Sequence, residues 1–106
     1  MNRRLELHDL FIGILGTEEE EFSRVYFQPP QDVQLMFPCI IYRRNTNDTR
    51  YASDKLYKTR KSYSVTVVDS DPDGLIPDKV ALLPYSRFER HYTADNLNHD
   101  VFNVYY

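Results

Sequence analysis

The stretch Ser62-Tyr63-Ser64-Val65-Thr66-Val67-Val68-Asp69 decides the fold class of this 106-residue chain. Aromatic and β-branched residues, which favour strands, make up most of it. Successive side chains of a strand point to opposite faces, so Tyr63, Val65 and Val67 share one face. The stretch therefore predicts a strand with one face buried against a core.

Four other stretches predict strands. They cover a short strand at residues 24–28, a strand at 39–44, and two strands at 85–93 and 99–106 joined by a turn at 94–98. Strands joined by a hairpin run antiparallel. The last strand is apolar on both faces from Val101 onward, so we expect it to be central in the sheet or covered by another subunit.

Two helices are predicted. The stripe of the first consists of Leu7, Leu10, Phe11, Ile14 and Leu15, and Gly16 is suited to end that helix. The second is short and follows Gly74, with Pro77 in its first turn and Pro84 after its end. Its apolar face consists of Ile76, Val80 and Leu83.

These elements predict one α+β domain over residues 1–106. We expect a mostly antiparallel sheet of four to five strands with two helices packed on one face. Residues 45–61 hold turn formers and basic residues but almost no aliphatic ones. They predict a long, mobile, basic β-hairpin arm.

Composition limits the location and the redox chemistry. The net charge is −3, and no apolar run reaches the roughly 20 residues of a spanning helix, so we expect no membrane association. Charged residues interrupt the N-terminal stretch, which argues against a signal peptide. The single cysteine, Cys39, excludes an intrachain disulfide, and its apolar strand predicts a buried, unreactive thiol.

An aspartate cluster offers the sharpest motif. Asp69-Ser70-Asp71-Pro72-Asp73-Gly74 matches the opening of a calcium-binding loop, but Val80 stands where that loop needs a bidentate glutamate. We therefore expect no metal site. The aspartates are predicted to form side-chain turns and to cap the second helix.

No set of residues predicts catalysis or a bound cofactor. His91 and His99 lie on opposite arms of the last hairpin and could approach each other, but they lack a third metal ligand. Asp95, His99 and Asp100 form an acid/base group in sequence without a nucleophile in a recognisable context. A histidine on a strand face or in a turn is expected to be a hydrogen-bonded surface group, and His8 is the third histidine of the chain. We expect a protein that is not an enzyme.

The arm interleaves aromatic and basic residues. This pattern suits stacking on a nucleic acid, a solvated hairpin or contact with another subunit. The acidic net charge and the lack of a nucleic-acid-binding motif favour the last two. The predicted subunit-contact residues are Arg50, Tyr51, Lys55, Tyr57, Lys58, Tyr105 and Tyr106.

Four segments carry a resemblance to a known family. They are Val25-Tyr26-Phe27-Gln28-Pro29-Pro30, Phe37-Pro38-Cys39-Ile40-Ile41-Tyr42, Asp69-Ser70-Asp71-Pro72-Asp73 and Thr93-Ala94-Asp95-Asn96-Leu97-Asn98-His99-Asp100. Similar segments occur in small proteins encoded in the head-to-tail region of long-tailed bacteriophages. Over nearly its whole length the chain resembles the tail terminator, or tail completion, family.

The resemblance implies a structural virion protein at the head-proximal end of the tail, present in the host cytoplasm during assembly. Its subunits would form a homohexameric ring on the tail tube protein, stop tube growth and offer a surface to the head–tail connector protein. DNA would only pass through the ring lumen. The arm at residues 45–61 would correspond to the family's mobile hairpin, which would pack on the neighbouring subunit or line the ring.

Three other functions remain open from the sequence. One is another connector component, such as a stopper or head-completion protein. A second is a small nucleic-acid-binding regulator that uses the basic arm. A third is a hydrolase built around Asp95, His99 and Asp100.

Overall fold

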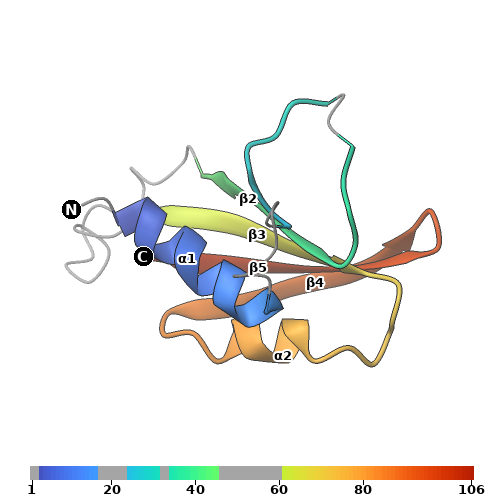
Figure 1. Cartoon of the computed structure of the whole chain (residues 1–106). Helices are drawn as coiled ribbons and strands as arrows, with labels where there is room; N and C mark the ends of the chain where they lie inside the picture. Colours follow the sequence, from blue (N-terminus) through green and yellow to red (C-terminus); the bar gives the residue numbers. More distant parts are fainter. Residues whose placement is uncertain (1–2, 17–23, 32–33, 46–60) are drawn as a thin grey trace.

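The computed structural model describes residues 3–16, 24–31, 34–45 and 61–106, and its elements confirm the α+β class (Figure 1). The elements are α1 (Arg3–Leu15), β1 (Val25–Phe27), β2 (Cys39–Arg44), β3 (Ser62–Asp69), α2 (Ile76–Ala81), β4 (Ser86–Ala94) and β5 (Leu97–Tyr105). The strands predicted at residues 39–44 and 62–69 coincide with β2 and β3.

The five strands form one mixed sheet in the order β1-β2-β3-β5-β4. β1 runs parallel to β2, with Val25 opposite Ile40, and every other neighbouring pair is antiparallel. β5 therefore lies between β3 and β4. The prediction that the last strand is central in the sheet is confirmed.

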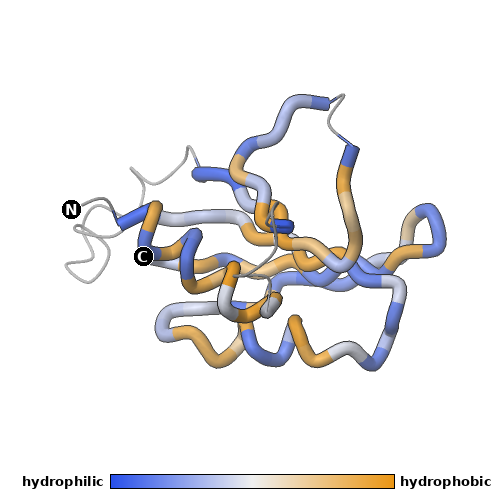
Figure 2. The backbone as a smooth tube through the Cα atoms, viewed as in Figure 1, coloured by the Kyte–Doolittle hydropathy of each residue, from blue (hydrophilic) through white to orange (hydrophobic). Residues whose placement is uncertain are grey.

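One face of the sheet carries the main core. Leu7 and Phe11 from α1 and Val80 from α2 belong to the same buried cluster as the strand residues. The strands contribute Val25, Ile40, Tyr42, Tyr63, Val65, Val67, Phe102 and Val104. Figure 2 shows hydrophobic residues along the middle of the strands and hydrophilic ones at the tip of the β4–β5 hairpin.

The first helix buries a narrower stripe than the sequence predicts. Leu7 and Phe11 are buried, and Ile14 and Leu15 pack against the core, but Leu10 is 41% exposed. Leu10 lies at one edge of the stripe, about 100° around the helix axis from the buried Phe11. The prediction that Leu10 faces the core is wrong.

The predicted arm falls mainly on residues 46–60, which lie outside the described residues. Asn45 and Lys61 flank this segment, at the end of β2 and the start of β3. The Asn45 amide donates to the Ser62 hydroxyl over 2.6 Å and to Asn103 Oδ1 over 3.0 Å, which joins three strands at this point. Within the part of the chain that the structure describes, no helix is long and apolar enough to cross a membrane.

Candidate functional site

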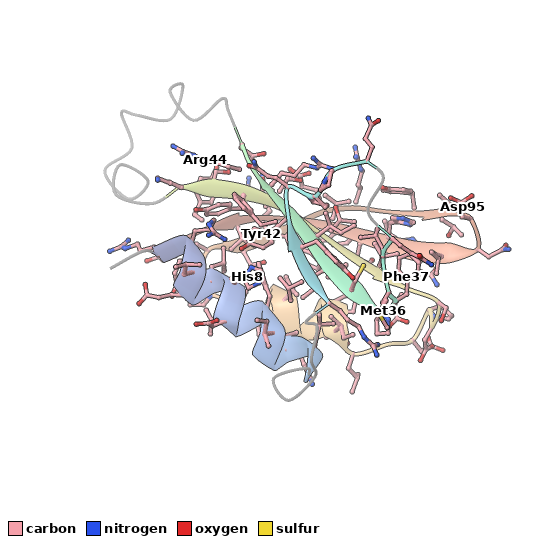
Figure 3. The ribbon with its side chains drawn as sticks, turned by 45° about the horizontal axis from the view of Figure 1, so that its top comes forward. His8, Met36, Phe37, Tyr42, Arg44 and Asp95 are labelled. Atoms are coloured by element: carbon pink, nitrogen blue, oxygen red, sulfur yellow. The ribbon has the colours of Figure 1, made fainter. Side chains whose placement is uncertain are left out.

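The two ends of the sheet differ in charge. The strand register aligns Cys39, Val68, His99 and Tyr92 at one end and Arg44, Tyr63, Val104 and Ser86 at the other. We name the first the acidic end and the second the basic end, after the residues described below. Figure 3 shows Asp95 and Phe37 toward one end and Arg44 toward the other.

The acidic end consists of two loops. The loop after β3 carries Asp69, Asp71 and Asp73, and the β4–β5 turn carries Asp95. Asp71 and Asp73 are exposed, as is Asp95. Antiparallel pairing of β3 and β5, with Asp69 opposite Asn98, brings the two loops to the same end of the sheet. Residues far apart in sequence thus form one acidic surface.

The aspartates after β3 form successive side-chain turns, as predicted. Asp69 Oδ1 accepts from the backbone N–H of Asp71 over 3.0 Å, and Asp71 Oδ1 accepts from that of Asp73 over 2.9 Å. The predicted capping of α2 is wrong. Leu75 occupies the N-cap position and no side chain there bonds to the helix, because the aspartates all precede Leu75.

An apolar knob, Met36 and Phe37, stands at the acidic end directly before β2. The two side chains are 53% and 41% exposed (Figure 3). The Met36 N–H donates to the Tyr26 hydroxyl over 3.2 Å, and the Arg24 guanidinium donates to the Phe37 carbonyl over 3.3 Å. These bonds tie the backbone of the knob to β1 and its start.

The basic end carries exposed cations on two strands and on the residue before β3. Arg43 and Arg44 end β2, Lys61 precedes β3, and Arg87 lies near the start of β4. All four are exposed. This end of the molecule therefore presents positive charge at the points where the predicted basic arm joins the sheet.

A tyrosine pocket of about 340 Å³ opens at the basic end. Arg3 and Glu6 line it from α1. Its apolar and aromatic lining includes Leu10, Leu83, Pro84, Tyr85, Tyr105 and Tyr106. The pocket therefore joins α1, the connection between α2 and β4, and the end of β5.

The backbone of the tyrosine pocket is defined by hydrogen bonds. The Tyr85 carbonyl accepts from the N–H of Tyr105 over 3.2 Å, and the Lys61 carbonyl accepts from that of Tyr106 over 2.9 Å. Tyr85 has a φ of 59°, a left-handed conformation that is uncommon for a residue with a side chain. Such strained residues gather at functional sites.

The pocket contains two of the seven residues predicted as subunit contacts, Tyr105 and Tyr106. The other five, Arg50, Tyr51, Lys55, Tyr57 and Lys58, lie outside the described residues. Sequence reasoning missed Arg3, Leu10 and Tyr85. The sequence does contain a signal for Leu10, because this residue lies at the edge of the apolar stripe of α1.

A second cluster of polar side chains lies between α1 and β2. His8 Nδ1 is 2.7 Å from the Tyr42 hydroxyl, and the Arg4 guanidinium donates to the same oxygen over 3.3 Å. Burial, with a smaller effect of Arg4, lowers the pKa of His8, so its imidazole is favoured in the neutral form. Burial also raises the pKa of Tyr42. The hydroxyl can then accept from Arg4 and donate to His8 Nδ1.

The predicted approach of His91 and His99 does not occur. His91 pairs with Asp100 and His99 with Tyr92, so the two histidines point to opposite faces of the sheet. The side chains of His99 and Asp100, successive residues of β5, also point to opposite faces of the sheet. The acid/base group suggested by the sequence is therefore not formed. Among the described residues, no three histidine, cysteine, aspartate or glutamate side chains are grouped to hold a metal ion.

Cys39 is buried, and its burial raises the pKa of the thiol to about 12. A thiol with so high a pKa is almost wholly protonated at neutral pH and is a poor nucleophile. The prediction that Cys39 is buried is confirmed.

No family model, curated protein or solved structure gives a significant match to this chain.

Proposed function

We propose that the chain is a non-catalytic virion subunit of the tail terminator type, which assembles into a ring on the tail tube. The ring ends tube growth and offers its free side to the head–tail connector. The proposal combines the sequence resemblance with one geometric observation, the different chemistry of the two ends of the sheet.

A closed ring of identical subunits needs two different patches on each subunit, because every contact joins one patch to the other. An acidic end and a basic end on the same sheet meet this requirement. An isologous dimer built on either end alone would instead bring like charges together, which is unfavourable. The charge distribution therefore favours head-to-tail association.

Three of the four segments that carry the resemblance meet at the acidic end. Cys39 lies opposite Val68, and Val68 lies opposite His99. The segments at residues 37–42, 69–73 and 93–100 therefore contribute to one continuous surface. A shared surface is the expected result if the similar residues serve the same contact in each protein.

Electron microscopy of particles lacking this protein tests the proposal. We expect overlong tails or tails without heads. Full heads that leak DNA would instead identify a connector component, such as a stopper or head-completion protein. Tails of normal length that are joined to stable heads would contradict both functions.

Removal of residues 49–58 tests the proposed role of the basic arm. We expect the shortened protein to fold, as judged by circular dichroism, and to fail in tail completion. Substitution of Arg50, Lys55 and Lys58 by glutamine is the matched variant that keeps the chain length. Tails of normal, uniform length with the shortened protein would show that the arm is not needed.

A further inference from the structure

We propose that the apolar knob of one subunit, Met36 and Phe37, inserts into the tyrosine pocket of a second copy of this chain. The acidic end of the first copy then lies against the basic end of the second. This contact is the subunit interface of the proposed ring. That such contacts close into a ring rests on the proposed function.

The knob has the properties of an interface anchor. Methionine and phenylalanine are enriched in the buried centres of interfaces, and here both are largely exposed. Hydrogen bonds from Met36 N–H to Tyr26 and from Arg24 to the Phe37 carbonyl already hold the backbone. Less conformational entropy is therefore lost when the knob binds.

The tyrosine pocket has complementary chemistry. Its volume of about 340 Å³ lies at the lower end of the range for binding pockets, about 300–1,000 Å³. Tyr85, Tyr105 and Tyr106 offer ring edges and faces, which favour contact with a phenylalanine ring and with a methionine sulfur. Leu10 completes the lining with an apolar side chain that α1 leaves exposed.

Charge complementarity identifies the occupant as a second copy. The knob is neighboured by the acidic loop of Asp69, Asp71 and Asp73, whereas Lys61 and Arg87 lie at the end that carries the pocket. Docking the knob into the pocket brings these opposite charges together. Long-range attraction of this kind accelerates association and fixes orientation, and salt weakens it.

The knob cannot reach the pocket of its own chain. β2 separates them, and six residues of strand extend about 17 Å at about 3.3 Å per residue. The contact therefore joins two copies of the chain. In the proposed ring it is heterologous, and it repeats from subunit to subunit until the rotation between neighbours closes the ring.

Disulfide trapping tests the contact with the knob and pocket intact. The variant Gln34→Cys/Glu6→Cys carries one thiol beside the knob and one at the pocket. We expect mild oxidation to give a ladder of cross-linked multimers, and each single variant to give dimers at most. Gln34→Cys/Glu89→Cys is the control, since Glu89 is exposed on β4 away from the pocket lining. The buried Cys39 should stay unreacted.

Adding Phe37→Ser to the trapping variant should reduce the ladder about tenfold or more, as for truncation of an aromatic anchor. High salt should also reduce it. A ladder that matches the Gln34→Cys/Glu89→Cys control, or one that Phe37→Ser leaves unchanged, would overturn the proposal.

A mixing experiment tests whether the knob of one copy binds the pocket of another. The knob variant, Met36→Ser/Phe37→Ser, keeps its pocket, and the pocket variant, Leu10→Asp, keeps its knob. By analytical ultracentrifugation at high concentration we expect each variant alone to be monomeric and their mixture to stop at dimers. Both changes lie at exposed side chains, and urea unfolding checks that each variant is folded. Self-association of the pocket variant alone would contradict the proposal.

Disulfide trapping, taken together with the tails of particles that lack the protein, distinguishes this contact from the proposed function. If trapping fails but particles lacking the protein have overlong tails, the contact is wrong and the function stands. If trapping succeeds but such particles are normal, the contact stands and the function is wrong.

Discussion

His8 Nδ1 lies 2.7 Å from the hydroxyl of Tyr42, and this contact joins α1 to β2 across the buried face of the sheet. Tyr42 is fully buried, and its ring also meets the Phe11 ring edge-on at 5.2 Å between centroids. The helix is thus held both by apolar packing and by a hydrogen bond. The contributions of the packing and of the hydrogen bond to the free energy of unfolding can be measured separately.

The protein should lose stability as the pH falls through about 6.5. Burial and Arg4 lower the pKa of His8 in the folded state, and Asp9 opposes them only in part. Below about 6.5 the unfolded chain therefore binds more protons at this position than the folded chain does, so the free energy of unfolding decreases. The decrease should end once the pH is below the folded pKa.

Urea unfolding over a pH series measures this effect. His8→Gln removes the titrating group, so the difference in free energy of unfolding between the two proteins should depend on pH in this window. A difference that stays constant with pH would contradict the assignment. His99→Gln is the matched control at a histidine that stacks on Tyr92 instead of facing a buried hydroxyl.

Tyr42→Phe should destabilise the fold by about 1–3 kcal/mol. The ring packing is kept, but His8 and Arg4 lose the oxygen that they share in a partly buried place. Tyr92→Phe, on the exposed edge strand β4, should change stability by less than about 0.5 kcal/mol. Equal effects of the two substitutions on urea unfolding would show that the buried hydroxyl contributes nothing.

Gly74→Ala should destabilise the loop at the acidic end. A Cβ at this position would lie 2.5 Å from Asp69 Oδ2, in the carboxylate whose other oxygen accepts from Asp71. The expected cost is about 1–2 kcal/mol, in the range of ordinary destabilising substitutions. In an Asp69→Ala background the same change should cost less, because the clashing carboxylate is gone. Purely additive effects would contradict the proposed clash.

Asn96→Gly should stabilise the β4–β5 hairpin, because Asp-Gly is a preferred pair in turns with two left-handed residues. Asp95 and Asn96 have φ values of 55° and 62°, so they form a two-residue turn in which both residues are left-handed. Glycine adopts this conformation without steric cost. Asn98→Gly lies inside β5 and should instead destabilise the hairpin. A lower melting temperature for Asn96→Gly would contradict the turn assignment.

Local patterns predicted the elements well where one physical signal dominates. β2 and β3 match their predicted bounds because continuous runs of strand-forming residues end at polar ones. The parallel pairing of β1 with β2 was not predictable, because residues 28–38 join them without a hairpin signature. The N-cap at Leu75 was likewise missed, because aspartates nearby suggest capping more strongly than leucine does.

The candidate site was hidden for a different reason. Asp69 and Asp95 lie at the same end of the sheet only through the register of β3, β5 and β4, and no local pattern contains that register. The tyrosine pocket joins Arg3 to Tyr105, near opposite ends of the chain. Sequence reasoning selected Tyr105 and Tyr106 from their apolar surroundings, but their neighbours in space come from the topology.

The central position of β5 also governs the order in which the chain can fold during synthesis. β4 leaves the ribosome before β5, which is its partner in the sheet. Ser86 therefore stays unpaired until Val104 has been synthesised. β2 and β3 can pair earlier. Until β5 inserts, the edge of β3 and the strand β4 both remain unpaired, and such edges invite pairing with other nascent chains. Many copies made at once would be most exposed to aggregation in this interval.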